Sequence, residues 1–304
     1  MTYNQLWKRL TVIYNEREAQ AIVRTVLDAL FGMSLTDICL GKVTQLSADD
    51  TTRLEKIMQR LEKSEPVQYV LGSEWFAGRL FDVAPGVLIP RPETEDLVKW
   101  ACDEAKEKEK EDNSKEERGK EEKEVYKKGE VPHPSILDIG TGSGCIAITV
   151  ALALPQARVT AWDISTDALD IAAGNAHRLG ASVRFEHQDA LSAPDDEERW
   201  DVIVSNPPYI CDRERADMSD NVLSYEPELA LFVPDSDPLL FYRAIARYAS
   251  KALKPGGRLL FETNTAYAHE VAQAMANEGF TAIEVRNDCF GKPRMVKGAF
   301  IREE

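Results

Sequence analysis

The stretch Asp138-Ile139-Gly140-Thr141-Gly142-Ser143-Gly144 decides the fold of this chain. An apolar segment at 136–139, typical of a buried strand, leads into it, and a helical pattern follows at 146–153. Glycines here permit a tight turn and let a ligand approach the backbone, with its anionic group at the start of the helix. Because dinucleotide-binding folds use similar turns, the glycines alone do not identify the ligand.

Strands and helices alternate outward from this turn. Strand candidates lie at 136–139, 159–162, 183–185, 202–204, 258–261, 282–285 and 295–301, and helical stretches lie around 146–153, 168–179 and 239–253. Alternation of this length predicts an α/β fold with a doubly wound, mostly parallel sheet of seven strands. The last two candidates are separated only by a loop, which predicts a closing hairpin.

The chain before this sheet has two parts of different character. Apolar residues recur at helical spacing up to about residue 72, as at 54–61 after the start signal at Ser47. We expect a small helical bundle over 1–72, which is either a stabilising appendage or a partner-binding module. Aromatic and apolar residues around turn signals at 73–90 predict a β-hairpin that links the bundle to a domain over 91–304.

Composition narrows the class of protein. The net charge of −15 argues against nonspecific phosphate contacts with nucleic acid, which need a basic face. No apolar run is long enough to span a bilayer, and the first 20 residues lack the apolar centre of a secretory leader, so we expect a cytoplasmic protein. The five cysteines and four histidines show no metal-ligand spacing, so we expect no metal.

One segment is almost entirely charged. Residues 103–130 hold 12 acidic and 9 basic side chains, counted from the sequence. Such a composition predicts either a solvated helical extension or a disordered insertion.

Acidic residues follow the strands at the positions where a nucleoside would be bound. Asp138 precedes the first glycine and suits a cationic amino acid better than a pyrophosphate, because a carboxylate repels phosphate. Asp163 ends the strand at 159–162 and can accept both ribose hydroxyl hydrogens. Asp189 follows the strand at 183–185, where an adenine amino group would be bound. A solvated turn or a helix cap is the alternative for both, but together the three acids favour S-adenosylmethionine.

The segment Asn206-Pro207-Pro208-Tyr209 comes directly after the apolar strand at 202–204. Two prolines continue neither a ladder nor a helix, so a rigid loop forms at the carboxyl end of the strand, where ligands bind in such sheets. The oxygens of Asn206 and Pro207 can accept both hydrogens of a planar NH₂ group, and Tyr209 can stack on its face. A mere turn is the alternative.

These residues suit methyl transfer to a planar amide or amine nitrogen. An amide nitrogen is a poor nucleophile because its lone pair is delocalised, and removing its proton beforehand costs too much. Hydrogen bonds to both N–H groups can raise its electron density and aim it at the methyl group. The sulfonium is a good leaving group, so no strong base is expected.

With these motifs the chain resembles the release-factor glutamine N5-methyltransferases (the HemK/PrmC family), which have the class I methyltransferase fold. The segment Asn206-Pro207-Pro208-Tyr209 is shared with other amino-methylating enzymes, but its combination with Ile89-Pro90-Arg91-Pro92-Glu93-Thr94-Glu95 is far more specific. The similarity covers most of the chain, with further signatures at 66–72, Phe76 with Gly78, 138–144 and 291–296.

The resemblance implies transfer of a methyl group from S-adenosylmethionine, leaving S-adenosylhomocysteine, to the glutamine of the Gly-Gly-Gln tip of class-1 peptide chain release factors. It implies that the helical domain helps to bind the release factor, and that Arg91 and Glu93 shape the mouth of the site. Substrate-binding and catalytic roles fall on Asn206, Pro207, Pro208 and Tyr209. Cofactor-binding roles fall on Gly140, Thr141, Gly142, Ser143, Gly144, Asp163, Asp189 and Asn206.

The chain departs from the family pattern in three places. Some members have an aromatic residue at Ala190, the segment 262–265 lacks the usual glycine, and the insertion at 103–130 is not a general feature. Two alternatives stay open: an adenine-N6 methyltransferase of nucleic acids, which would need a basic face, and a catalytically idle cofactor-binding adaptor. We expect a monomer without direct nucleic-acid or membrane contacts.

Overall fold

The computed structural model of the chain describes residues 1–119 and 133–301, and of 112–119 the backbone alone. It divides into two compact units. The first comprises Met1–Ser73, Val83–Pro85 and Asp217–Glu226, and the second comprises Glu74–Asp82, Gly86–Ala216 and Pro227–Glu304. This division assigns most of the expected hairpin linker to the second unit and a later segment to the first. The expected domain borders at residues 72 and 90 stay a prediction.

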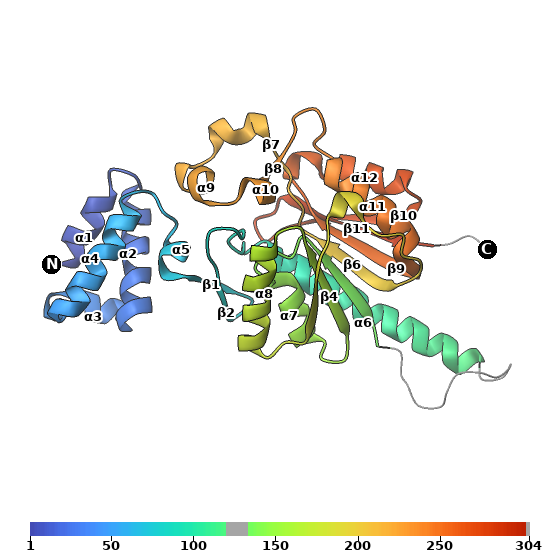
Figure 1. Cartoon of the computed structure of the whole chain (residues 1–304), viewed down its shortest axis with the longest axis horizontal. Helices are drawn as coiled ribbons and strands as arrows, with labels where there is room; N and C mark the ends of the chain where they lie inside the picture. The colour runs from blue at the N-terminus through green and yellow to red at the C-terminus, as the bar shows by residue number, and fades with distance from the viewer. Residues whose placement is uncertain (120–132, 302–304) are drawn as a thin grey trace. The chain divides into compact units, whose positions relative to one another are not determined.

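The first unit is the expected helical bundle (Figure 1). Its helices are α1 (Tyr3–Leu10), α2 (Glu16–Phe31), α3 (Leu35–Cys39), α4 (Ala48–Leu61), α5 (Val67–Leu71) and α9 (Asp220–Tyr225), with a 3₁₀ turn η1 (Lys42–Gln45). The Asn15 side chain accepts the Glu18 amide of α2, and the Ser47 side chain accepts the Asp50 amide of α4, which explains why these helices begin there. Tyr225 on α9 donates its hydroxyl to the Lys63 carbonyl at 2.8 Å.

The second unit contains a seven-stranded sheet in the order β10-β11-β9-β6-β3-β4-β5. The strands are β3 (Ser135–Ile139), β4 (Arg158–Asp163), β5 (Val183–His187), β6 (Trp200–Ser205), β9 (Leu253–Glu262), β10 (Phe280–Asn287) and β11 (Pro293–Phe300). All neighbours pair in parallel except β11, which runs antiparallel to both β9 and β10. This confirms the predicted class I methyltransferase fold and its closing hairpin.

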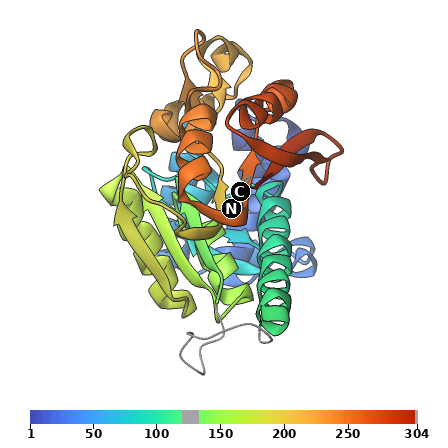
Figure 2. The same ribbon diagram turned by 90° about the vertical axis from the view of Figure 1, so that its right-hand side faces the viewer.

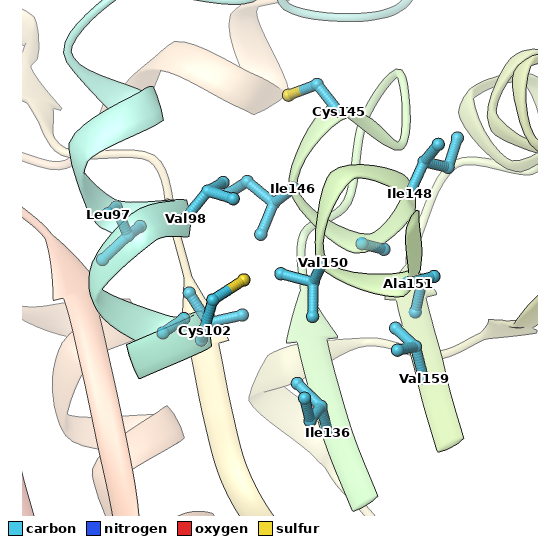
Figure 3. Packing of buried hydrophobic residues seen from close by; sticks show 14 of the residues in the cluster. Leu97, Val98, Cys102, Ile136, Cys145, Ile146, Ile148, Val150, Ala151 and Val159 are labelled. Atoms are coloured by element: carbon cyan, nitrogen blue, oxygen red, sulfur yellow. The ribbon is translucent and has the colours of Figure 1, made fainter. Parts of the chain in front are cut away.

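Helices cover both faces of this sheet. Along β3, Ile136 packs with α6 (Thr94–Gly119), α7 (Cys145–Ala153) and α8 (Thr166–Leu179), as Figure 3 shows for α6 and α7. The next residue, Leu137, packs on the other face with α11 (Leu240–Ala252) and α12 (Ala268–Asn277). Burial on both faces explains the continuous apolar runs in these strands. The sequence pattern did not predict α12.

Shorter elements surround the sheet. The hairpin β1 (Ser73–Phe76) and β2 (Arg79–Asp82) packs Phe76 edge-on against Phe81 in the core beneath α6. The strands β7 (Ile210–Cys211) and β8 (Phe232–Val233) form a separate two-stranded sheet. The other short elements are α10 (Glu228–Leu231) and the 3₁₀ turns η2 (Ala190–Ser192), η3 (Asp212–Asp217) and η4 (Thr265–Tyr267).

The charged segment begins inside α6. Over residues 103–119 it continues this helix, which runs beside the sheet in Figure 2, and its remainder to 130 lies outside the described residues. Glu104 is buried and accepts Nζ of Lys297 at 2.6 Å, Nε1 of Trp100 at 2.9 Å and Nε of Arg258 at 3.3 Å. The helical extension is therefore confirmed over 103–119, but it is not fully solvated, because its first turns pack on the sheet through paired charges. No helix in the described ranges is long and apolar enough to cross a bilayer.

Candidate active site

The glycine turn between β3 and α7 is fixed by its own backbone. The amides of Gly140 and Thr141 both donate to the Trp162 carbonyl at 2.9 Å, which ties the turn to the end of β4. The Gly142 amide donates to Asp163 Oδ2 at 2.8 Å. The turn and the acidic end of β4 therefore form one rigid unit.

Gly144 permits close packing of α7 against α8. A Cβ at this position would lie 2.6 Å from Ile148 Cδ1 and 3.1 Å from Ala172 Cβ, and its φ of +82° is unfavourable for side chains. We expect Gly144→Ala to lower the free energy of unfolding by about 1–3 kcal/mol, because overpacking adds to backbone strain. Chemical denaturation measures this, with Gly174→Ala as the control, since the Gly174 site has open space. Equal stability of the two variants would contradict it.

Asp138 acts within the turn. Its Oδ2 accepts the Thr141 hydroxyl at 2.7 Å and the Ala147 amide at 3.2 Å, joining strand, turn and helix. Its Oδ1 is buried and has no hydrogen-bond partner among the described residues. Burial raises the pKa of Asp138 to about 7. Asp138 does not line the adjoining pocket, so this arrangement differs from the direct ligand contact suggested by the sequence.

Asp163 and Asp189 line one pocket of about 310 Å³. Asp163 also accepts the Ser165 amide on Oδ1 at 2.9 Å, in addition to the Gly142 amide on Oδ2. Asp189 Oδ1 accepts the Leu191 amide at 2.8 Å. Backbone donors thus orient both carboxylates, and each oxygen keeps further acceptor capacity for hydroxyl or amino groups of a ligand.

Apolar side chains form much of the rest of this pocket. Ile164 and Leu191 flank the two acids, and Phe241 and Ile245 come from α11. Ala190 lies among them, so the larger apolar surfaces here come from its neighbours Ile164, Leu191, Phe241 and Ile245. Such surfaces suit the flat faces of a nucleobase. None of these four apolar residues was predicted from the sequence, although Ile164 and Leu191 are next to Asp163 and Ala190 in the chain.

The segment after β6 opens onto the same pocket. The pocket is lined by Gly140 and Gly142 of the glycine turn and by Asn206, Pro207 and Pro208 of residues 206–209, which we call the proline segment. The glycine turn and the proline segment therefore border one space. Pro207 is buried and Asn206 is partly exposed. The predicted ligand residues from β3, β4, β5 and β6 therefore meet at the carboxyl edge of the sheet, where ligands bind in such folds.

Other predicted site residues lie outside the pocket lining. Thr141, Ser143 and Gly144 are behind the turn, where Thr141 and Ser143 are buried. Arg91, Glu93 and Tyr209 do not line the pocket either.

Tyr209 instead adjoins a buried carboxyl group at the end of β9. Its hydroxyl lies 3.2 Å from Glu262 Oε1, and the Thr94 hydroxyl donates to Glu262 Oε2 at 2.6 Å. Burial raises the pKa of Glu262 to about 7, and the charge of Glu93 acts in the same direction. Burial also raises the pKa of the Tyr209 phenol, with a further contribution from Glu262. Tyr209 therefore stays protonated near neutral pH and cannot serve as a base.

Within residues 1–111 and 133–301, no three His, Cys, Asp or Glu side chains gather in a metal-binding arrangement.

Comparisons with known proteins match both parts of the chain. Residues 4–72 match the family model of the PrmC N-terminal domain, and residues 127–224 match that of the methyltransferase small domain. A release factor glutamine methyltransferase of Bacteroides thetaiotaomicron is 44% identical over 285 residues, covering 93% of this chain and 94% of the relative. One from Flavobacterium psychrophilum is 36% identical, covering 97% of each chain, and one from Neisseria gonorrhoeae is 39% identical, covering 82% of each.

Proposed function

The chain belongs to the release factor glutamine methyltransferase family, and from this premise we propose the reaction that it catalyses. It transfers a methyl group from S-adenosylmethionine to the side-chain amide nitrogen (N5) of the glutamine in the Gly-Gly-Gln motif of class-1 peptide chain release factors. The observation that carries this proposal is the common pocket bordered by Asp163, Asp189 and Asn206. In this pocket two carboxylates that suit the ribose and adenine of a nucleoside lie on the same space as an asparagine that suits an amide NH₂ group.

The residues of the pocket fit the proposed cofactor. Asp163 presents oriented carboxylate oxygens to the ribose hydroxyls, Asp189 presents an acceptor to the adenine amino group, and Ile164 with Leu191 contacts the base. The glycine turn lets the amino-acid part approach the backbone. When bound, S-adenosylmethionine supplies a methyl group carried on a sulfonium, and loss of that methyl group leaves S-adenosylhomocysteine.

The proline segment provides the second half of the site. We assign the Asn206 side-chain oxygen and the Pro207 carbonyl to the two hydrogens of the glutamine NH₂ group, and the Tyr209 ring to the face of the amide. Two accepted hydrogen bonds raise electron density on nitrogen and fix its direction of attack. The N–C bond forms as the C–S bond breaks, and the nitrogen then loses a proton to solvent. Because Tyr209 stays protonated near neutral pH, we assign it to positioning the amide and not to base catalysis.

The remaining assignments follow from the same proposal. Residues 1–72 contribute to release factor binding, 73–90 link the parts, and 91–304 carry out methyl transfer, with Arg91 and Glu93 at the mouth of the site. The enzyme acts in the cytoplasm as a monomer, needs no metal, and contacts neither membrane nor nucleic acid directly.

The test of this proposal is transfer of labelled methyl from S-adenosylmethionine to purified acceptors. The full chain is incubated in parallel with a class-1 release factor, with adenine-containing DNA and with adenine-containing RNA. We expect label on the release factor alone. Label on either nucleic acid and none on the protein would replace this proposal by the adenine-N6 alternative, and no label on any acceptor would favour the adaptor.

A further inference from the structure

Tyr209 is hydrogen-bonded at both ends to one short segment, 262–264, which begins with the last residue of β9. Its hydroxyl lies 3.2 Å from Glu262 Oε1, and its main-chain carbonyl accepts Asn264 Nδ2 at 3.3 Å. These two contacts involve opposite ends of the same residue. They come from the part of the chain, 262–265, that departs from the family pattern.

Glu262 is placed beside the proline segment by the sheet itself. β9 and β6 run parallel with Phe261 opposite Ser205, so Glu262 and Asn206 follow at the same edge. The Glu262 side chain is fully buried, with the Thr94 hydroxyl on Oε2 at 2.6 Å. Its main-chain carbonyl accepts the Tyr242 hydroxyl from α11 at 3.2 Å. The contact from the start of α6 therefore fixes the carboxyl group that bonds to Tyr209, and the contact from α11 fixes the main chain that carries it.

Asn264 is fixed in the same way. Its Oδ1 accepts the Ala266 amide at 3.0 Å, and its Nδ2 lies 3.2 Å from both carboxylate oxygens of Glu214. Glu214 Oε1 in turn accepts the Cys211 amide at 2.9 Å. Asn264 and Glu214 thus bind the backbone on either side of Ile210, which sets the path of the chain as it leaves Tyr209.

We propose that Glu262 and Asn264 are positioning residues that orient Tyr209 for the amide of the substrate, Glu262 through the phenol oxygen and Asn264 through the main-chain carbonyl. This inference rests on the proposed function, in which the Tyr209 ring packs on the face of the glutamine amide. Stacking on a planar group requires a defined ring plane. A ring bonded at only one end can tilt, and small misplacements of this kind cost up to about 100-fold in rate.

The test is a double-mutant cycle on kcat, measured with a release factor as acceptor at saturating S-adenosylmethionine. Glu262→Leu removes the acceptor for the phenol, and Tyr209→Phe removes the phenol itself. We expect each to lower kcat by about 10- to 100-fold, and the double variant to be no slower than the slower single one, because both remove the same contact. Glu262→Gln keeps an acceptor oxygen, so it restores most of kcat.

The matched control is another buried carboxylate at the opposite end of the sheet. Asp201 accepts the Ser135 hydroxyl at 2.7 Å and the Lys254 ammonium at 2.6 Å. Asp201→Asn therefore perturbs a comparable buried network and lowers stability, but kcat per folded molecule stays as in the wild type. The Kd for S-adenosylmethionine, measured by calorimetry, stays unchanged in the Glu262 and Tyr209 variants.

Two results would overturn the inference: a wild-type kcat in Glu262→Leu, or a double variant whose loss is the product of the single losses. If Glu262→Leu does not fold, Asn264→Ala tests the second contact alone, and a wild-type kcat there counts against the inference equally. Failure of the proposed function is a different outcome, because the wild-type chain would then transfer no methyl to the release factor at all.

Discussion

Asn206→Ala reduces methyl transfer to a release factor by about 100- to 1,000-fold, the range observed when one oriented hydrogen-bonding group is removed from a catalytic site. Asn206 lies at the end of β6 and lines the pocket beside Pro207. Its side-chain oxygen is one of the two proposed acceptors for the substrate NH₂ group. Without it the amide keeps one hydrogen bond and can rotate away from the methyl group.

The measurement is kcat and KM with labelled S-adenosylmethionine, together with the cofactor Kd. Asn206 also borders the cofactor part of the pocket, so we expect that Kd to rise, but by no more than about tenfold, the value of one hydrogen bond. Asn206→Asp is the matched variant, because it keeps an acceptor oxygen in the same shape and should retain more activity than Asn206→Ala. A normal kcat in Asn206→Ala would contradict the assigned role of this side chain.

Asp163→Ala weakens S-adenosylmethionine binding by about 10- to 100-fold, which corresponds to losing charge-assisted hydrogen bonds of roughly 1.5–3 kcal/mol. The variant loses the proposed acceptor for the ribose hydroxyls. It also frees the Gly142 and Ser165 amides, which the carboxylate now orients. The glycine turn therefore loses one of its fixed contacts at the same time.

Calorimetric titration of the full chain with S-adenosylmethionine checks this prediction. Asp170→Ala is the matched control, since it removes the same charge from an exposed position on α8 that does not line the pocket. We expect the control to bind like the wild type. Equal affinities for Asp163→Ala and Asp170→Ala would show that Asp163 does not contact the cofactor.

Local patterns in the sequence predicted most of the fold. The apolar runs of β3, β4, β6, β9 and β11 are buried, because helices cover both faces of the sheet, whereas those of the edge strands β5 and β10 are only partly buried. The acids that line the pocket were also predictable. Asp163 ends β4 and Asp189 comes shortly after β5, and the carboxyl ends of parallel strands meet at one edge.

What could not be predicted depends on contacts between distant parts of the chain. Glu262 is 53 residues from Tyr209 and 168 from Thr94. The order of β6 and β9 in the sheet brings it to Tyr209, and the packing of α6 brings it to Thr94. The helix α12 was missed, although Val271, Ala274 and Met275 have helical spacing. Alanine-rich segments give a weak apolar pattern, and the helix is stabilised by its packing against the sheet.

The most direct test of the central claim is to locate the methyl group by tandem mass spectrometry. A class-1 release factor and its Gln→Ala variant at the Gly-Gly-Gln motif are each incubated with the full chain and S-adenosylmethionine, and then digested. We expect one methyl group on the side-chain nitrogen of that glutamine, and an unmodified variant. A methyl group on another residue, or equal methylation of the variant, would contradict it.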